Sequence, residues 1–215
     1  MVRQARSEAT RKKIVNAAVD LFAEVGYQAT GLGDIIERAE LTKGALYYHF
    51  DSKEALATAI IEDGANTALT AFRNIGEPTA PALENMIHGV FVVADLIRTD
   101  RMVRAGAQLL RAFGEFNEAN VLTQGQLLVE MVNQARQAII EGDLRDDLDP
   151  QDVSEVIVSA MLGAELVANV SSGGADLIER IATTWSLLLP ALVTEESMPY
   201  FREFLGRESM RHTNR

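Results

Sequence analysis

Residues 42–53 hold the side chains whose types and spacing could do chemistry. They read Thr-Lys-Gly-Ala-Leu-Tyr-Tyr-His-Phe-Asp-Ser-Lys, which combines a helix-capping threonine, two lysines, one glycine and two adjacent tyrosines. Lysine and tyrosine donate hydrogen bonds to phosphate oxygens and can contact base edges, while glycine lets a backbone approach DNA closely. The stretch therefore predicts a nucleic-acid contact surface rather than a catalytic centre.

Two segments before this stretch must position it. Residues 7–25 carry apolar side chains at the spacing of one helix face, and Gly26 then ends that helix. A shorter amphipathic helix follows, with Thr30 as its expected N-cap. The inward-facing residues of these two helices are expected to be Ile14, Ala17, Ala18, Leu21, Phe22, Leu32, Ile35, Ile36 and Ala39.

A third helix begins near Thr42, and its residues Leu46 and Phe50 face inward because they lie four positions apart. Three short helices with a tight second turn predict a helix-turn-helix unit. From residue type alone, the tyrosines could instead form a core edge and the histidine could be packed. The DNA contacts that we predict are Thr30, Thr42, Lys43, Gly44, Tyr47, Tyr48, His49 and Lys53.

The charge of the chain is unevenly distributed. The formal net charge is −11, yet residues 1–55 carry eight Lys/Arg and eight Asp/Glu, so the acidity lies in residues 56–215. A cationic N-terminus could follow a phosphate backbone or enter a minor groove, and a solvated helix start is the alternative. Its cations are Arg3, Arg6, Arg11, Lys12 and Lys13. Screening limits repulsion from the acidic part beyond about 10 Å at ordinary salt.

The N-terminal segment resembles the TetR family of bacterial transcriptional repressors. The resemblance rests on Gly26-Tyr27, Thr30, Asp34-Ile35, the run from Thr42 to Phe50, and Ser52 to Leu56. It implies that Tyr47 and Tyr48 lie at the DNA surface. The run from Thr42 to Phe50, the Arg-Gln-Ala-Arg start and the late Trp-Ser-Leu-Leu-Leu-Pro segment are similar to those of the γ-butyrolactone receptors of actinomycetes.

One residue departs from the family pattern in the turn between the second and third helices. Glu40 stands where the family usually has glycine. If the backbone there is left-handed, a residue other than glycine costs about 1–2 kcal/mol. We therefore expect strain at Glu40.

The rest of the chain reads as helices separated by three breaks, at residues 76–81, 142–150 and 171–174. No alternating strand pattern or phosphate-binding glycine loop is present, so we predict an all-α fold. Its expected domains are a helix-turn-helix DNA-binding domain at residues 1–52, a larger helical effector-binding and dimerisation domain at 53–205, and a flexible tail at 206–215. The fourth helix is expected to begin at Asp51, because Asp51 and Glu54 have capping-box spacing.

Two late segments, at about residues 151–170 and 175–193, carry more apolar residues than one bundle face needs. Small residues at Ala160, Gly163 and Ala164 allow close helix approach. The family resemblance implies that these helices form a four-helix homodimer interface, and internal packing is the alternative. Two-fold symmetry of the protein predicts an inverted-repeat operator.

An effector pocket between helices is expected in the second domain. The candidate residues are Phe91, Leu109, Phe113, Gln126, Met131, Met161 and Glu165. Apolar residues at helical spacing could equally be plain core. In γ-butyrolactone receptors a tryptophan of the pocket helix packs on the lactone, whereas residues 118–141 contain none and the single tryptophan is Trp185. Trp185 is expected in core or dimer contacts.

Other classes of protein fit the sequence poorly. His49, His88 and His212 lack metal-ligand spacing, there is no cysteine, and no serine stands in an elbow motif, so we predict no enzyme, no cofactor and no metal site. The acidic loop of residues 143–152 lacks the glycine and terminal glutamate of a calcium loop. A purely architectural DNA protein would not need so large an acidic body.

The sequence therefore predicts a dimeric repressor that binds double-stranded DNA at a palindromic operator and is released by a small-molecule effector. The effector could be a γ-butyrolactone-like signal or another apolar molecule, as in an efflux-type sensor, and a pseudo-receptor without ligand response is a further alternative. The absence of long apolar runs and of an apolar signal segment predicts a cytoplasmic protein that does not enter a membrane.

Overall fold

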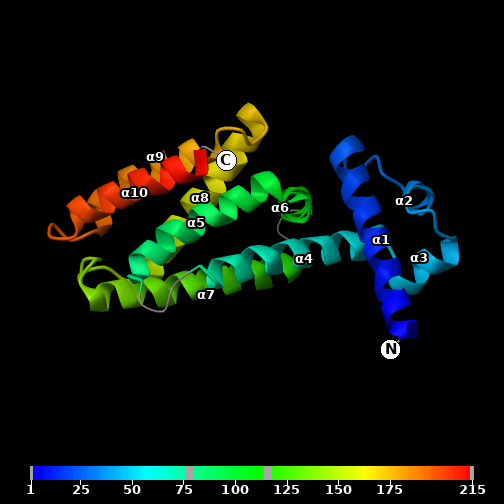
Figure 1. The fold of residues 1–215 in the computed structure, drawn as a ribbon, viewed down its shortest axis with the longest axis horizontal. Helices are drawn as coiled ribbons and strands as arrows, with labels where there is room; N and C mark the ends of the chain where they lie inside the picture. The colour runs from blue at the N-terminus through cyan, green and yellow to red at the C-terminus, as the bar shows by residue number, and fades with distance from the viewer. Residues whose placement is uncertain (1, 76–79, 114–117, 214–215) are drawn as a thin grey trace. The chain divides into compact units, whose positions relative to one another are not determined.

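The computed structural model describes residues 2–75, 80–113 and 118–213, and this part of the chain is helical with no extended sheet. This confirms the predicted all-α fold (Figure 1). The helices are α1 (Val2–Val25), α2 (Leu32–Arg38), α3 (Lys43–His49), α4 (Lys53–Arg73), α5 (Ala82–Thr99), α6 (Arg101–Phe113), α7 (Glu118–Glu141), α8 (Pro150–Ser172), α9 (Leu177–Leu192) and α10 (Met198–Thr213).

The chain forms two compact units. The first comprises Met1–Thr67 with Asp100–Val121, and the second comprises Ala68–Thr99 with Leu122–Arg215. The first unit thus includes the start of α4 and the whole of α6, whereas the sequence placed a domain border at residues 52 and 53. The functional division at that border stays a prediction.

In the first unit, α1 packs against α2, α3 and α6. Its core contains the residues predicted from the helical spacing in α1, together with Ile35, Leu46 and Phe50. Ala105 and Leu109 of α6 and Ile60 of α4 complete this core. The short α2 and α3 are therefore held by apolar burial, because helices of seven residues are marginal by themselves.

Helices α4 and α6 approach closely in the first unit at two glycines. A Cβ atom on Gly64 would lie 2.9 Å from the carbonyl oxygen of Met102 and 3.3 Å from the Cα of Val103. A Cβ on Gly106 would lie 3.2 Å from the carbonyl oxygen of Ile60. Both neighbours are backbone atoms, so the helices themselves would have to separate to admit a side chain.

Gly64→Ala is expected to lower the stability of the first unit by about 1–3 kcal/mol, because overpacking against backbone has no side chain to relieve it. Thermal unfolding measures this as a lower melting temperature. Gly206→Ala is the matched control, since nothing lies within 4 Å of the added Cβ at that helical site. It should be neutral or raise stability by about 0.5–1 kcal/mol. An equal loss in both variants would contradict the close approach.

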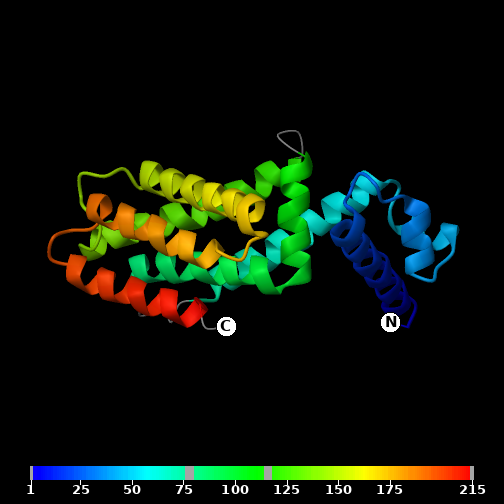
Figure 2. The ribbon, with the colours of Figure 1, turned by 90° about the horizontal axis from the view of Figure 1, so that it is seen from above.

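In the second unit, α9 packs against α8, α10 and α5, and α5 also packs against α10 (Figure 2). The centre of this core holds Trp185, Phe91 and Phe201, none of them more than 1% exposed. The expectation that Trp185 lies in core or dimer contacts is thus resolved in favour of the core. Asp149 caps α8 through Gln151 N at 2.7 Å, and the left-handed Gly173 (φ 63°) ends it.

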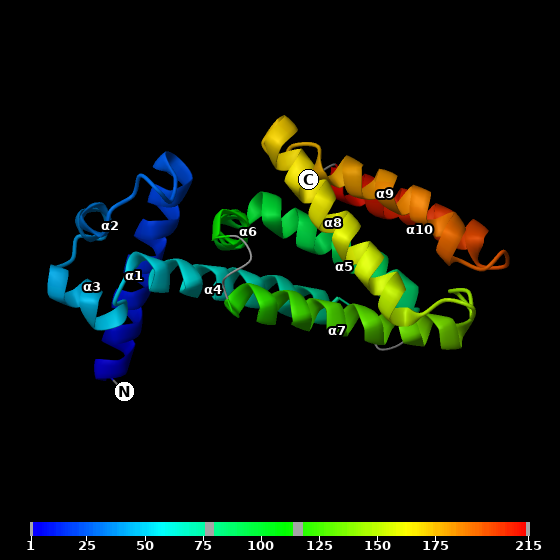
Figure 3. The same cartoon turned by 180° about the vertical axis from the view of Figure 1, so that it is seen from behind.

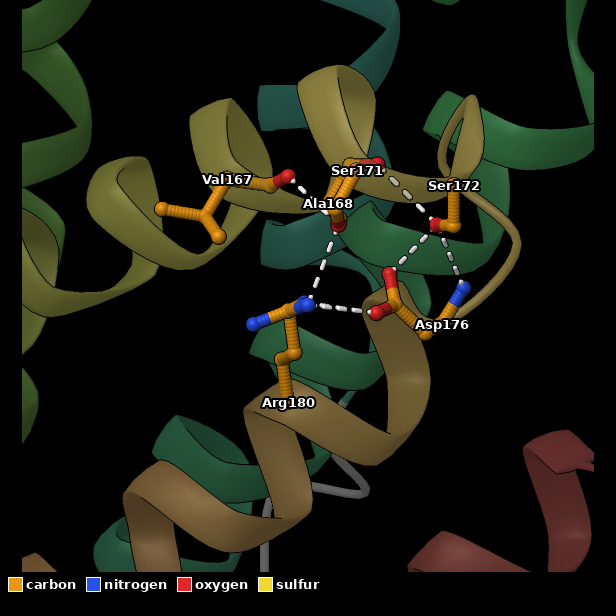
Figure 4. Close-up of polar contacts among 6 residues, drawn as sticks. All are labelled: Val167, Ala168, Ser171, Ser172, Asp176 and Arg180. Carbon is orange, nitrogen blue, oxygen red and sulfur yellow. Dashed lines mark hydrogen bonds and ion pairs between the residues drawn. The ribbon is translucent and has the colours of Figure 1, made fainter.

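A polar network fixes the turn from α8 to α9 (Figure 4). Ser172 Oγ donates to Asp176 Oδ1 at 2.6 Å and accepts from the backbone amide of Asp176 at 3.2 Å. Arg180 Nε donates to Asp176 Oδ2 at 2.8 Å, and Arg180 Nη2 donates to Ser171 Oγ at 3.0 Å. These bonds join the last turn of α8 to the first turn of α9.

The flexible tail predicted at residues 206–215 is wrong for Gly206 to Thr213. These residues continue α10, and Phe201, Leu205, Glu208 and His212 are buried on one face of it. Glu208 and His212 are only 1% and 2% exposed. The interior stripe of α10 thus changes from apolar to ionisable residues where the sequence predicts a frayed end.

Candidate nucleic-acid interface

Helix α3 is positioned by one cap and two buried anchors. The side-chain oxygen of Thr42 accepts a hydrogen bond from Ala45 N at 3.2 Å, which satisfies one of the first amides of the helix. Leu46 is 0% and Phe50 is 6% exposed, as their spacing predicts. This cap and these anchors determine which face of α3 reaches the surface.

The outward face of α3 carries most of the predicted DNA contacts. Lys43 and Gly44 are exposed, Tyr47 is 42% exposed and Tyr48 is 75% exposed. Lys43 Nζ lies 5.7 Å from the centre of the Tyr47 ring. His49 is half-buried and packs edge-on against Tyr48, with ring centres 5.0 Å apart. The face therefore presents one cation and two phenol groups on a short rigid element.

Glu40 lies in the left-handed region, with φ at 53°, which confirms the strain expected in this turn. Leu41 N donates to Ile36 O at 3.1 Å and Glu40 N donates to Glu37 O at 3.0 Å. This pair of bonds is a Schellman motif, in which the left-handed position is the one that glycine usually occupies. The strained residue thus closes α2 directly before α3.

Glu40→Gly is expected to raise the free energy of unfolding by about 1 kcal/mol, because glycine adopts the left-handed conformation without a Cβ clash. The measurement is thermal unfolding, where this gain corresponds to about 2–4 °C for a chain of this size. Glu40→Ala is the control for charge, since alanine keeps the Cβ. A rise of the same size in the alanine variant would assign the effect to charge instead.

Two residues predicted to contact DNA, Thr30 and Lys53, form hydrogen bonds within the first unit. Thr30 is 1% exposed and its hydroxyl donates to Gly26 O at 2.8 Å, so its side chain has no surface for DNA. Lys53 Nζ donates to Tyr27 O and Thr30 O, both at 2.9 Å, and lies 4.3 Å from the Tyr27 ring centre. Lys53 therefore closes the α1–α2 connection with two of its three ammonium donors.

The N-cap expected at Thr30 is also wrong. The N-cap of α2 is Gly31, whose amide donates to Asp34 Oδ2 at 2.8 Å. Tyr27 lies beside this connection and donates to Glu54 Oε1 at 3.4 Å. Burial, the charge of Glu54 and that hydrogen bond raise the pKa of Tyr27 to about 12, so the phenol keeps its proton at all ordinary pH values.

The N-terminal cations differ in their surroundings. Arg6, Lys12 and Lys13 are exposed along α1. Arg11 Nη1 instead donates to Asp63 Oδ2 at 3.2 Å, and its guanidinium lies 5.6 Å from the Phe50 ring centre. Arg3 lies outside the residues whose side chains are described. Arg6, Lys12 and Lys13 thus remain as exposed candidates for phosphate contacts on the first unit.

The predicted effector residues are not brought together as one set. Phe91 and Met131 are buried in the core of the second unit, and the partly buried Met161 packs against that core. Leu109 belongs instead to the core of the first unit. Glu165 is half-buried and Gln126 is exposed, while the side chain of Phe113 lies outside the described residues. Five of the predicted residues, Phe91, Gln126, Met131, Met161 and Glu165, lie in the second unit, whereas Leu109 lies in the first.

The outer faces of α8 and α9 are apolar and exposed in the single chain, with α8 turned toward the viewer in Figure 3. Leu162, Leu166 and Val170 lie one helical turn apart along α8 and are 44%, 50% and 79% exposed. Leu187 of α9 is 74% exposed. These two helices were predicted to carry more apolar residues than one bundle face needs. Some of those residues are indeed exposed in the single chain, whereas Val153, Ile157 and Ile181 pack inside.

Among the described residues, α8 alone is long and apolar enough to cross a membrane by length and composition. Core helices of soluble proteins can have the same length and apolar composition. The helix also carries Asp152, Glu155 and Glu165, which suit a water-facing or protein-facing helix better than a bilayer.

Comparison with known proteins decides the family. Residues 14–60, from the buried part of α1 through α3 into α4, match the bacterial regulatory proteins of the tetR family. The A-factor receptor protein of Streptomyces griseus is 31% identical over 201 residues, covering 89% of this chain and 67% of the receptor. This chain belongs to the TetR family. Membership confirms the prediction of a DNA-binding transcriptional regulator that is not an enzyme.

Two solved TetR structures extend the likeness over nearly the whole chain. A γ-butyrolactone receptor described as ArpA-like is 27% identical with a TM-score of 0.78, and the match covers 96% of this chain and 99% of that one. CprB from Streptomyces coelicolor, in complex with its biological operator sequence, is 28% identical with a TM-score of 0.76 over 96% of this chain and 99% of that one. The structural likeness therefore covers the second unit in addition to the first.

Proposed function

We propose that this TetR-family chain is a cytoplasmic repressor that binds an inverted-repeat operator as a homodimer and leaves it when a small molecule binds its second unit. The observation that carries the proposal is the outward face of α3, where Lys43, Tyr47 and Tyr48 are exposed above two buried anchors. The likeness to CprB, whose structure contains its operator, supports the same use of this unit.

The DNA surface of the proposal is narrower than the sequence predicts. It comprises Lys43, Gly44, Tyr47, Tyr48 and His49 of α3 with the cap Thr42, and it leaves out Thr30 and Lys53. Lysine and tyrosine here would contact phosphates or base edges, and the exposed Arg6, Lys12 and Lys13 would add phosphate contacts. The acidic charge outside residues 1–55 does not oppose this, because screening limits its reach.

The proposed dimer uses the exposed faces of α8 and α9. Leu162, Leu166 and Val170 on one helix and Leu187 on the next form an apolar surface that water would otherwise cover. The polar network at Asp176 links the end of α8 to the start of α9, so the two faces belong to connected helices. A two-fold dimer presents two copies of α3, and such a pair reads two half-sites.

The proposed effector is a small molecule of the γ-butyrolactone class. Support comes from the match to the A-factor receptor protein over 89% of this chain, which extends far beyond the DNA-binding helices. Trp185 lies at 0% exposure in the core, so the contact that a tryptophan makes in γ-butyrolactone receptors would need another residue here. Release requires that the ligand favour a conformation whose two α3 helices no longer match successive major grooves.

The test starts from genomic fragments of the source organism that the purified protein retains. Fluorescence anisotropy should show binding to an inverted repeat, and an insertion of about five base pairs between half-sites should abolish it, because the half-sites then face opposite sides of the duplex. Micromolar γ-butyrolactones should release the operator. Release only by other apolar molecules would refute the effector class, while failure to retain any operator would refute the repressor itself.

A further inference from the structure

Three ionisable residues meet inside the second unit, away from the candidate DNA surface. His88 comes from α5, while Glu208 and His212 lie one helical turn apart on α10. The side chains of Glu208 and His212 are 1% and 2% exposed, and that of His88 is 25% exposed. Buried ionisable groups require partners, and these three side chains lie close enough to serve one another.

The nitrogen and oxygen atoms of these three side chains converge. His88 Nδ1 is in hydrogen-bond contact with Glu208 Oε2, and His212 Nε2 lies 3.6 Å from the same oxygen. One ligand atom from each residue lies within 4.8 Å of the other two. Ligands of a tetrahedral zinc ion at about 2.0–2.1 Å are separated by about 3.3 Å, so small side-chain rotations would bring all three to one ion.

The carboxylate of Glu208 is oriented by its neighbours on both sides. His88 Nδ1 contacts one of its oxygens, Oε2. Arg211 Nη1 lies 2.8 Å from Oε1, the oxygen that does not face the imidazoles. Hydrogen bonding of one carboxylate oxygen in this way orients the other toward a metal, as outer partners do in metal sites.

The surroundings also suit a bound cation. The Phe91 ring stacks on His212 with centres 5.7 Å apart, which fixes the imidazole plane. Arg98 Nη1 donates to the backbone oxygen of His212 at 3.4 Å, and its charge is offset by Asp95, whose Oδ1 lies 3.9 Å away. Arg211 is 55% exposed, so solvent screens its repulsion of a second cation.

From this geometry we propose that His88, Glu208 and His212 form a binding site for a divalent transition-metal ion of the zinc type, which fastens α10 to α5. Two imidazole nitrogens and one carboxylate oxygen are the protein ligands of one known kind of zinc site, in which a fourth position stays open. Imidazole favours zinc and its neighbours over magnesium and calcium, which take oxygen ligands. The ion would take the place of the hydrogen bond between His88 and Glu208.

The test uses the full chain after treatment with a chelator, titrated with Co²⁺ as a spectroscopic probe and then with Zn²⁺ in competition. Wild type should bind one Co²⁺ per chain with visible d–d absorption, and Zn²⁺ should displace it. A hundredfold excess of Zn²⁺ over its Kd should raise the melting temperature by about 5 °C or more.

The deciding variant is His88→Gln, because His88 is partly exposed and its loss spares the buried residues of α10. It should weaken Co²⁺ binding at least hundredfold and remove the d–d bands. His49→Gln is the matched control, since it also removes one imidazole but in the first unit. His212→Gln adds a second ligand change, with circular dichroism to check its fold.

The proposal is overturned if wild type binds no stoichiometric Co²⁺ at micromolar concentration. It is equally overturned if His88→Gln and His49→Gln bind alike. A cluster held together only by hydrogen bonds would bind no Co²⁺, and Zn²⁺ would not change its melting temperature. None of these readouts depends on operator binding, so they stand apart from the proposed repressor function.

Discussion

Leu187→Glu should convert the proposed dimer into a folded monomer that no longer binds its operator. Leu187 is 74% exposed in the single chain, so the substitution costs the isolated fold little. In a two-fold dimer the same leucine is lost twice, and each buried leucine contributes about 1.5–3 kcal/mol. Two unpaired carboxylates in an apolar interface add to that loss. The dimer dissociation constant should rise on the order of a thousandfold or more.

The measurement is sedimentation velocity over a concentration series, with circular dichroism to check the helical content. Ile140→Glu provides the matched control, because Ile140 is 72% exposed on α7, outside the α8 and α9 faces. That variant should remain a dimer and bind DNA as wild type does. A dimer of unchanged affinity in Leu187→Glu would show that the exposed leucine is not part of the interface.

Loss of operator binding in the monomer follows from geometry rather than from damage to α3. One copy of α3 contacts one half-site, and the affinity of two linked contacts exceeds that of either alone. Leu187 lies in the second unit, whereas Lys43 and Tyr48 lie in the first. If Leu187→Glu in the second unit abolishes DNA binding by the first unit, the loss therefore reports on dimer formation.

The sequence predicts those parts of the fold in which local pattern and burial agree. Leu46 and Phe50 are inward because four residues make one helical turn, and the structure confirms both as core. Asp149 and Pro150 begin α8 and Gly173 ends it, near the boundaries that the breaks in the sequence indicate. Glu40 was expected to be strained, and its φ of 53° confirms this.

Long-range contacts explain where the structure differs from the local interpretation of the site residues. Lys53 looks like a phosphate ligand because it is a lysine near α3, yet its ammonium reaches carbonyls 26 and 23 residues away in sequence. Leu109 and Phe91 both look like pocket residues, but they belong to cores of different units. Local spacing carries no information on which helices meet, so the sequence could not predict these two sets of contacts.

The α10 helix shows a different failure. Its inner face follows a helical stripe of Phe201, Leu205, Glu208 and His212, in which the last two are ionisable. The stripe of apolar residues ends at Leu205, so the sequence pattern predicts a frayed tail from residue 206 onward. The signal that could have been used is the four-residue spacing of Glu208 and His212, which places both on the face that Leu205 already buries.

Lys43→Ala and Tyr48→Ala should each weaken operator binding by about tenfold to a hundredfold without unfolding the dimer. Both side chains are exposed, and Tyr48 is 75% exposed, so their loss leaves the core of the first unit intact. Each substitution occurs twice in the dimer, so a contact worth about 1 kcal/mol per copy costs about 2 kcal/mol in total. Fluorescence anisotropy on the selected operator measures the loss.

The salt dependence of Lys43→Ala identifies what the lysine contacts. If it neutralises a phosphate, two copies release about two fewer counterions, and the slope of log affinity against log salt should become shallower by about 1.8. Affinity should then fall equally for cognate and altered operators, whereas a base contact would relax discrimination at one base pair of each half-site. Arg202→Ala removes one exposed cation from the second unit and is the control for net charge. Wild-type affinity in both Lys43→Ala and Tyr48→Ala would remove this face of α3 from the DNA interface, because no other exposed cation lies on α3.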